Sequence, residues 1–254
     1  MSESRNKQEY FEKAAAYDMM ANYYKYLDPN MHMHYYQKHL QALMKAIQQA
    51  GSEYRPAQQS DQPKGVIRFL NSSIDNPNVD VYINSFRIFR NIPYKQASNY
   101  LSLPAGKYHI DIYPAENQVA SILNRRISVE PGKIYTLPII GSEKKHRLLS
   151  FEDHLHVPKG ETKFRFIHLA VDAPEVDLAV VKGDVVFPKV AFKTATGYLP
   201  LSPMTVDLEL RMAGTKEVLM PLHKLQFKEN EVYSIILAGL QQGEPRIETF
   251  IIRG

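Results

Sequence analysis

One stretch of this chain occurs twice, and the repeat limits the folds that the sequence can adopt. Residues 66–83 have the sequence VIRFLNSSIDNPNVDVYI, and residues 164–180 have the related sequence FRFIHLAVDAPEVDLAV. Ten positions match in register, four at a spacing of 97 residues and six at a spacing of 98, which a one-residue insertion explains. We therefore expect residues 64–254 to hold two copies of one module. The matching pairs include Arg68 and Arg165, Asp75 and Asp172, Pro77 and Pro174, Asp80 and Asp177, and Tyr100 and Tyr198.

Each copy has the pattern of a β-sandwich. In the first copy, short runs of β-branched, aromatic and aliphatic residues alternate with turns rich in Asn, Asp, Pro and Gly. About seven such strands, with a turn every 8–12 residues or so, are typical of an antiparallel sandwich. The sequence predicts a mainly β chain, with two tandem antiparallel, immunoglobulin-like β-sandwich domains preceded by a helical hairpin. The strands predicted in the first copy are 66–70, 79–83, 86–89, 100–103, 107–113, 122–129 and 134–140.

The first 50 residues have a helical pattern instead. Ala, Glu, Lys and Met, which favour helices, are common there. Asp28 and Pro29 suit an N-cap and a first helical residue, so we expect a second helix over 30–50 that ends at Gly51. One face of the first helix is predicted at Tyr10, Ala14, Tyr17, Ala21 and Tyr24, and the apolar stripe of the second at Tyr36, His39, Leu40, Leu43 and Ile47.

Tyrosine is concentrated in this hairpin: residues 10–54 hold eight of the 16 tyrosines of the chain. The rings either fill the contact between the helices or form an exposed aromatic face. Two helices alone enclose too little apolar surface to be stable, so the hairpin must pack on the β-modules, on a second copy or on a partner. We expect a protein partner or a homo-oligomer through the hairpin, with candidate contacts at Tyr10, Tyr17, Tyr23, Tyr24, Tyr35 and Tyr36.

Composition changes along the chain predict the domain order. A tract rich in Gln, Ser and Pro follows the hairpin and resembles a flexible tether. We expect a hairpin at 1–51, a linker at 52–64, a first sandwich at 65–141, a connector at 142–162 and a second sandwich at 163–254.

Charge and composition narrow the classes of partner. The net charge is +4 and the basic residues are dispersed; the densest runs, Arg125-Arg126 and 144–147, are too short for a nucleic-acid surface, and we expect them to be solvated. The chain has no cysteine, which is compatible with a reducing compartment. We find no signal peptide in the first 20 residues and no run of about 18 apolar residues for a membrane span. We expect a cytoplasmic protein, with later deposition on a spore or envelope structure as an alternative.

The repeated aspartates are the clearest candidate site. Asp75 and Asp80, and likewise Asp172 and Asp177, lie five residues apart around a proline and could begin an oxygen cage for calcium. A structural role is favoured, in which Asp75 and Asp172 cap the turn before Pro77 and Pro174 while Asp80 and Asp177 bond backbone amides. We expect no cofactor and no metal, including at His32, His34 and His39, whose spacing does not suit zinc.

The phrases IDNPNVDVYIN and VDAPEVDLAVV, with YLSLPAGKYHIDIYP and PGKIYTLPIIG, resemble the bacterial family catalogued as domain of unknown function 4397. The likeness covers residues 65–141 well and 163–240 less well. The resemblance implies an immunoglobulin-like or transthyretin-like sandwich, often in tandem and often in cell-surface proteins, without known catalytic residues. The second copy departs from the pattern at Ser202-Pro203-Met204, which replaces the Pro-Ala-Gly turn. The hairpin is similar to extensions in relatives from spore-forming bacilli.

The sequence is compatible with three classes of function. We favour a non-catalytic structural, assembly or protein-interaction role, in which the hairpin docks and the sandwiches are displayed. A glycan- or cell-wall-binding module is the alternative, with Tyr82, Tyr100, Tyr113 and Tyr198 as stacking platforms. A hydrolase is the third, although the chain has no Cys nucleophile, no GxSxG elbow and no Gly-rich phosphate loop; His168 is expected to be structural.

Overall fold

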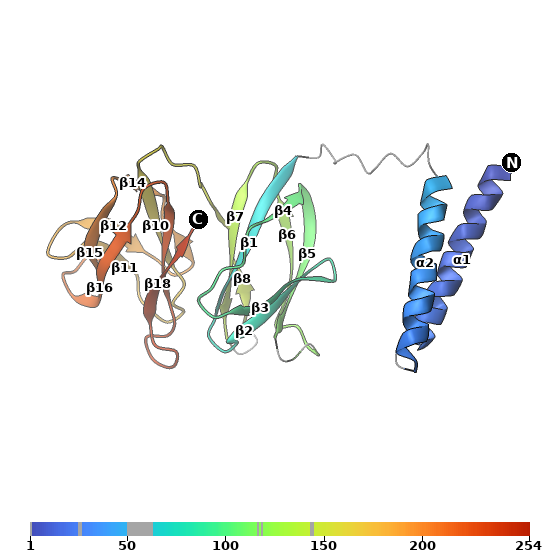
Figure 1. Ribbon diagram of the computed structural model, residues 1–254. Helices are drawn as coiled ribbons and strands as arrows, with labels where there is room; N and C mark the ends of the chain where they lie inside the picture. Colours follow the sequence, from blue (N-terminus) through green and yellow to red (C-terminus); the bar gives the residue numbers. More distant parts are fainter. Residues whose placement is uncertain (1, 25–26, 50–62, 116, 118, 143–144) are drawn as a thin grey trace. The chain divides into compact units, whose positions relative to one another are not determined.

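The computed structural model describes residues 2–24, 27–49, 63–115, 117, 119–142 and 145–254. The chain divides into two compact units, residues 1–61 and residues 62–254. The first contains the helices and the second contains all of the strands (Figure 1). The predicted fold class is confirmed: the chain is mainly β, with four sheets and an N-terminal helical hairpin.

The hairpin consists of α1, Ser2–Tyr24, and α2, Pro29–Gln49. Asp28 caps α2 as predicted, because its Oδ1 accepts a hydrogen bond from the Met31 amide at 3.2 Å. The helices meet through small side chains, and the buried residues of the contact are Ala14, Ala21, Ala42 and Ala46. Alanines let two helix backbones approach closely, so the larger side chains are displaced to the flanks of the contact.

The first repeat is a sandwich of two sheets. One has the order β4-β1-β7-β8, with β9 also paired to β7, and the other has the order β3-β2-β5-β6. Alternate side chains from both sheets, including Phe69, Val81, Ile110 and Leu137, fill the core between them. The strands are β1 Lys64–Ser73, β2 Asn78–Ile83, β3 Phe86–Pro93, β4 Leu101–Pro104, β5 Gly106–Pro114, β6 Leu123–Val129, β7 Ile134–Gly141, β8 Arg147–Leu148 and β9 Phe151–Glu152.

The second repeat has the same design. Its sheets have the orders β13-β10-β17-β18, with β14 also paired to β10, and β12-β11-β15-β16. Phe164, Phe166, Leu178, Leu210 and Ile235 belong to its core. The strands are β10 Thr162–His168, β11 Val176–Val180, β12 Val185–Val190, β13 Thr194–Ala195, β14 Leu199–Leu201, β15 Met204–Met212, β16 Val218–Phe227, β17 Val232–Ala238 and β18 Glu248–Arg253.

Each repeat contains one parallel pair of strands, which differs from the all-antiparallel arrangement expected. β1 pairs with β7 and β10 pairs with β17 in parallel register. β1 and β10 are the first strands of their repeats, and β7 and β17 lie beside them in the same sheet, because the strands between them return the chain to its starting end. Strands so placed are covered on both faces, and every residue of β17 is buried.

A third apolar cluster joins the two repeats. Side chains that point away from the first core, such as Leu70 and Ile140, pack with Ile167, Leu169 and Ile236, which point away from the second core. The β1-β7 and β10-β17 sheets therefore face each other, and residues 62–254 form one continuous packed body (Figure 1).

The predicted domain boundaries remain a prediction, but two segments can be compared with the structure. The seven strands expected in the first repeat all occur, as β1 to β7. Residues 147–152, inside the expected connector, form β8 and β9 and extend the sheet of the first repeat. Most of the expected linker, residues 52–62, lies outside the described residues.

Candidate functional site

Two of the repeated aspartates hold backbone amides in the neighbouring strand. Asp80 Oδ1 accepts from the Asn91 amide at 2.7 Å, and Asp177 Oδ1 accepts from the Lys189 amide at 2.6 Å. Asn91 and Lys189 are equivalent, and both have a positive φ where the ladder shifts register. The carboxylates thus stabilise a β-bulge in each repeat, as expected from their position at the strand start.

The other two aspartates also reach a distant loop, and the turn cap expected of them stays a prediction. Within its own turn, Asp75 Oδ1 accepts from Ser73 Oγ at 3.0 Å and from Asn76 Nδ2 at 2.6 Å. Asp172 accepts from the amides of Gln241 and Gln242 at 2.6 and 2.9 Å. Asp75 contacts His146 Nε2 at 2.8 Å. Burial pulls the pKa of Asp172 upward, but the bonds from these amides and from its own amide bring it below the usual value. Both loops follow the last core strand of a repeat, so each aspartate anchors that loop.

The prolines between the aspartates lie in the same turns. The carbonyl of Pro77 accepts from the Tyr94 amide at 2.6 Å, and the carbonyl of Pro174 accepts from His168 Nε2 at 3.0 Å. Burial lowers the pKa of His168. Within the described ranges, no three His, Cys, Asp or Glu residues gather closely enough to hold a metal ion. In both repeats, hydrogen bonds to neighbouring backbone groups hold the turn motif in place.

The contact between the repeats contains a polar network centred on two buried arginines. Arg68 Nε donates to Thr136 Oγ1 at 2.9 Å, and Arg165 Nε donates to Ser234 Oγ at 3.0 Å. The guanidinium of each also lies over an equivalent tyrosine ring, Arg68 over Tyr100 at 4.4 Å and Arg165 over Tyr198 at 4.8 Å. We call these two arginines, with Thr136, Ser234, Tyr100, Tyr198 and Asp153, the seam.

The arginines cross the seam in opposite directions. Arg68 donates to the carbonyl of Arg253 in β18, and Arg165 donates to the carbonyl of Glu152 in β9 at 2.8 Å. Asp153 breaks this approximate two-fold symmetry, because its carboxylate accepts from Arg165 and from the Tyr100 hydroxyl, the latter at 2.8 Å. Burial and the Asp153 charge raise the pKa of Tyr100 well above its usual value.

The seam contains two of the four tyrosines that were candidates for stacking on sugars. Tyr100 and Tyr198 were candidate platforms for stacking sugars, but their rings are occupied by the seam arginines. Tyr82 and Tyr113, the other two candidates, contact each other edge to face at 5.1 Å. The sequence carried a signal for the seam: an arginine appears at the same place inside an apolar strand of both repeats.

The hairpin presents a second candidate surface. Four large apolar side chains on one face of α2 are exposed, from 37% for Leu40 to 62% for Met44. They recur at steps of three and four residues, so they form one continuous stripe. We call Met33, Tyr36, Leu40 and Met44 the α2 stripe.

The six candidate tyrosines occupy different positions on the hairpin. Tyr17 and Tyr24 each stack on Tyr35, at centroid distances of 6.4 and 5.6 Å. These three and Tyr10 are half-buried, whereas Tyr23 and Tyr36 are exposed. The tyrosines therefore cover the flanks of the helix contact and also extend onto the free surface.

Only part of the predicted stripe of α2 contacts α1. Tyr36 and Leu40 are exposed. His39, which belongs to the predicted stripe, and His32, which does not, donate hydrogen bonds from Nδ1 to the carbonyls of Ala14 and Ala21, each at 2.9 Å. The two histidines are seven residues apart in α2, and the two alanines are seven residues apart in α1. The same contact therefore recurs after two helical turns.

Comparison with known proteins finds a family model that matches part of the β unit. The model of the domain of unknown function DUF4397 matches residues 65–179. This part of the chain is similar to the DUF4397 family. The match covers the whole first repeat, its connection to the second, and the second through β11.

The DUF4397 match agrees with the resemblance seen in the sequence phrases, and the internal repeat extends the same design beyond residue 179. No curated protein matches the chain. The family name carries no activity, and no catalytic residue can be transferred from it.

Solved structures give weaker likenesses. The C-terminal domain of AlgF from Pseudomonas aeruginosa is 18% identical, and the match covers 38% of this chain and 100% of that domain with a TM-score of 0.30. The Bacillus anthracis TIE protein is 12% identical, with 75% of this chain and 44% of that protein covered and a TM-score of 0.24. A Parabacteroides distasonis protein provisionally assigned to cell adhesion is 8% identical, with coverages of 76% and 99% and a TM-score of 0.21. At these TM-scores, no function or partner of these proteins can be transferred to this chain.

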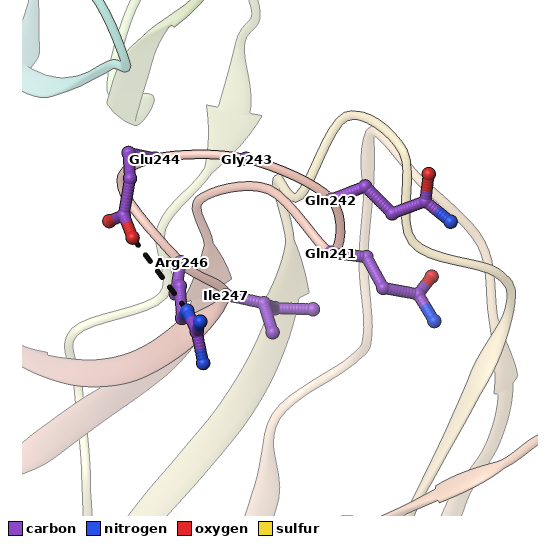
Figure 2. A pocket seen from close by; sticks show the side chains of 6 residues that line it. All are labelled: Gln241, Gln242, Gly243, Glu244, Arg246 and Ile247. Atoms are coloured by element: carbon purple, nitrogen blue, oxygen red, sulfur yellow. Dashed lines mark ion pairs between the residues drawn. The ribbon is translucent and has the colours of Figure 1, made fainter.

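A hollow of about 680 Å³ lies beside the loop that Asp172 anchors, beyond the DUF4397 match. Figure 2 shows Gln241 and Gln242 projecting to one side of this loop, while Glu244 and Arg246 pair with each other at 3.7 Å on the other. The lining of this hollow consists of two glutamines, Gly243, Ile247 and the exposed pair of Glu244 and Arg246. Neither described helix combines the length and apolar content required to cross a bilayer.

Proposed function

We propose that this is a non-catalytic assembly protein in which the helical hairpins of two copies associate and each copy displays its tandem β unit. The α2 stripe is the observation that carries this proposal. The buried side chains of the hairpin, among those described, are all alanines, while large apolar side chains are exposed. A hairpin built in this way gains stability when a further surface covers the stripe.

The stripe suits a second copy of itself. Its order is Met33, Tyr36, Leu40 and Met44, so the outer positions are both methionine and the inner positions are both large and apolar. If two α2 helices pack antiparallel about a two-fold axis, Met33 faces Met44 of the other copy and Tyr36 faces Leu40. A two-fold interface requires this kind of self-complementary surface.

Charge placement supports the same arrangement. α2 contains no Asp or Glu. Its lysines, Lys38 and Lys45, lie on a different face of the helix from the stripe. Lys38 instead lies over the rings of Tyr17 and Tyr35, at 5.7 and 5.8 Å. Two stripes can therefore meet without burying like charges. The resulting contact is a four-helix arrangement with an apolar centre.

The test measures the mass of the full chain in solution by light scattering. Wild type is expected to be a dimer, and Leu40→Glu to be a monomer, because the substitution places a charge at the centre of the stripe. Gln41→Glu adds the same charge on an exposed neighbouring position and should stay dimeric. A monomeric wild type, or equal masses for the two variants, contradicts self-association through the stripe.

We further propose that assembly begins in the cytoplasm and that the product is deposited on a cell-envelope or spore layer. A fluorescent fusion followed through growth and sporulation tests this location. A signal that stays diffuse at all stages contradicts it.

A further inference from the structure

A cleft in the first repeat brings together residues that the sequence places in two separate basic runs. It lies between the edge strands β6 and β8 and has a volume of about 400 Å³. A smaller hollow of about 290 Å³ continues along β6 and shares Arg125, Leu148 and Leu149 with it. We call the two hollows together the β6–β8 groove. The first hollow is lined by Leu123, Asn124, Arg125, His146, Arg147, Leu148 and Leu149.

The groove combines unpaired positive charge with an apolar wall. In the part of the chain that the structure describes, neither Arg125 nor Arg147 forms an ion pair, and both are exposed. The seam arginines, by contrast, are almost completely buried and fully engaged. Leu148 and Leu149 form the apolar wall. Glu130 lines the second hollow and is exposed.

The second repeat shows what the fold does at this place when no groove is present. Arg125 lies opposite Ile110, and its equivalent by strand pairing is Leu222, which lies opposite Leu208. Leu222 is only 4% exposed and packs in the second core. Ile247, the residue of the second repeat that is equivalent to His146, packs against the same core. The corresponding space in the second repeat is therefore filled by apolar side chains.

Charge is inverted at the other wall of the groove. Arg147 lies opposite Ile140 in β7, and its equivalent Glu248 lies opposite Ala238 in β17. Glu248 is paired with Lys95 at 3.0 Å. The two repeats thus share one architecture, and the first has opened a cationic groove where the second has a closed edge.

His146 lines the first hollow and is held by the turn around Asp75. Its Nε2 lies 2.8 Å from Asp75 Oδ1, 3.0 Å from Ser73 Oγ and 3.1 Å from Asn76 Nδ2. Because this side chain is almost completely buried, the groups that the groove offers to a ligand are the two guanidiniums and the leucines. A peptide segment offers carboxylates for the guanidiniums, apolar side chains for the leucines and backbone groups for the sheet edges.

We propose that the β6–β8 groove binds an extended peptide segment that carries acidic side chains. Alternate side chains of an extended chain are about 7 Å apart on the same face, which allows two of them to enter successive hollows along β6. Carboxylates would pair with the guanidiniums of Arg125 and Arg147, and apolar side chains would pack on Leu148 and Leu149. β6 and β8 are sheet edges, where an extended segment finds backbone groups to pair with.

The repeat itself supplies the test variants. Arg125→Leu installs the residue that the second repeat has at this place, and Arg147→Glu installs the charge of Glu248. Both should fold, because the second repeat accommodates these side chains in the same architecture. Arg90→Leu is the matched control, since Arg90 is an exposed arginine of β3 that does not line the groove.

Binding is measured by fluorescence anisotropy on the full chain. The probe is a labelled peptide of about eight residues, long enough to follow β6, in which glutamate alternates with leucine and serine. Wild type and Arg90→Leu should bind with the same Kd, and Arg125→Leu and Arg147→Glu should each weaken binding about tenfold or more. A peptide with lysine in place of glutamate should not bind.

Three results would overturn the proposal. The first is no binding of the glutamate peptide to wild type. The second is an equal loss in Arg125→Leu and Arg90→Leu, which would indicate nonspecific attraction. The third is binding of inorganic polyphosphate that depends on Arg125 while the peptide does not bind. None of these depends on the hairpin, so the outcome is independent of self-association.

Discussion

Replacing Asp153 with Asn should weaken the whole β unit more than the loss of one exposed ion pair. The carboxylate of Asp153 is completely buried and accepts from Arg165, Thr136 and Tyr100. Asparagine keeps the size of the side chain but removes the charge, and its NH₂ group faces donors. Arg68 and Arg165, 4% and 2% exposed, are then left in the seam without a counter-ion.

The expected loss follows from this geometry. Breaking a buried ion pair by removing one partner costs about 3–5 kcal/mol. For a unit of this size, that loss lowers the Tm by about 6–20 °C, at roughly 2–4 °C per kcal/mol. Because the seam joins the repeats, Asp153→Asn should also split a single unfolding transition into two.

The measurement is urea unfolding of the full chain followed by near-UV circular dichroism of tyrosine, since the chain has no tryptophan. Glu248→Gln is the control. It removes a pair whose side chains are more than one-third exposed, and such pairs contribute less than about 1 kcal/mol. If Asp153→Asn shifts the midpoint no more than Glu248→Gln, the seam does not couple the repeats and our reasoning is refuted.

Two further predictions concern the buried histidine and the helix contact. Burial lowers the folded pKa of His168 below the unfolded value of about 6.5, so the unfolded chain binds the proton more readily and stability falls as pH drops from about 7 toward that lowered pKa. His168→Asn, which installs the equivalent Asn71, should flatten this slope in unfolding measurements, whereas His154→Asn at an exposed site should not; equal slopes for His168→Asn and wild type contradict the assignment. In the hairpin, Ala46→Leu should lower the helix melting temperature, because overpacking a closed contact costs about 1–3 kcal/mol. Lys45→Leu, on an exposed position, should leave it unchanged, and an unaltered melt for Ala46→Leu would mean that the helices do not meet at Ala46.

Local chemistry explains which parts of the fold were predictable. The Asp28 cap and the turns between β1 and β7 depend on residues close in sequence, and these were predicted correctly. The strand β9 was not predicted as such, because β8 and β9 are only two residues long and exist through pairing with β7. Asp153 follows directly after β9. Its role could not be found from spacing, since its partners lie 12 to 85 residues away in the sequence.

Helix rotation and strand register limited the prediction of surfaces. The apolar stripe predicted for α2 consisted of Tyr36, His39, Leu40, Leu43 and Ile47, but the close contact of alanines turns Tyr36 and Leu40 outward. The groove could not be predicted from the repeat spacing, because a β-bulge in the second repeat changes which residue is equivalent to Arg125. Between β15 and β16 the register shifts near Lys224, so Arg125 is equivalent to Leu222 and not to the residue 98 positions later. Sequence spacing alone would have compared it with His223.

The two repeats act as an internal control for separating structure from function. Where both keep a residue, as at Asp80 and Asp177, the shared side chain serves the same backbone feature in each. Arg125 has no such justification: leucine at the equivalent place is buried and gains the free energy of removing apolar surface from water, about 2 kcal/mol. An exposed, unpaired arginine forgoes that gain. A fold that stays stable without it can use the position for binding, and the groove is where the first repeat has done so.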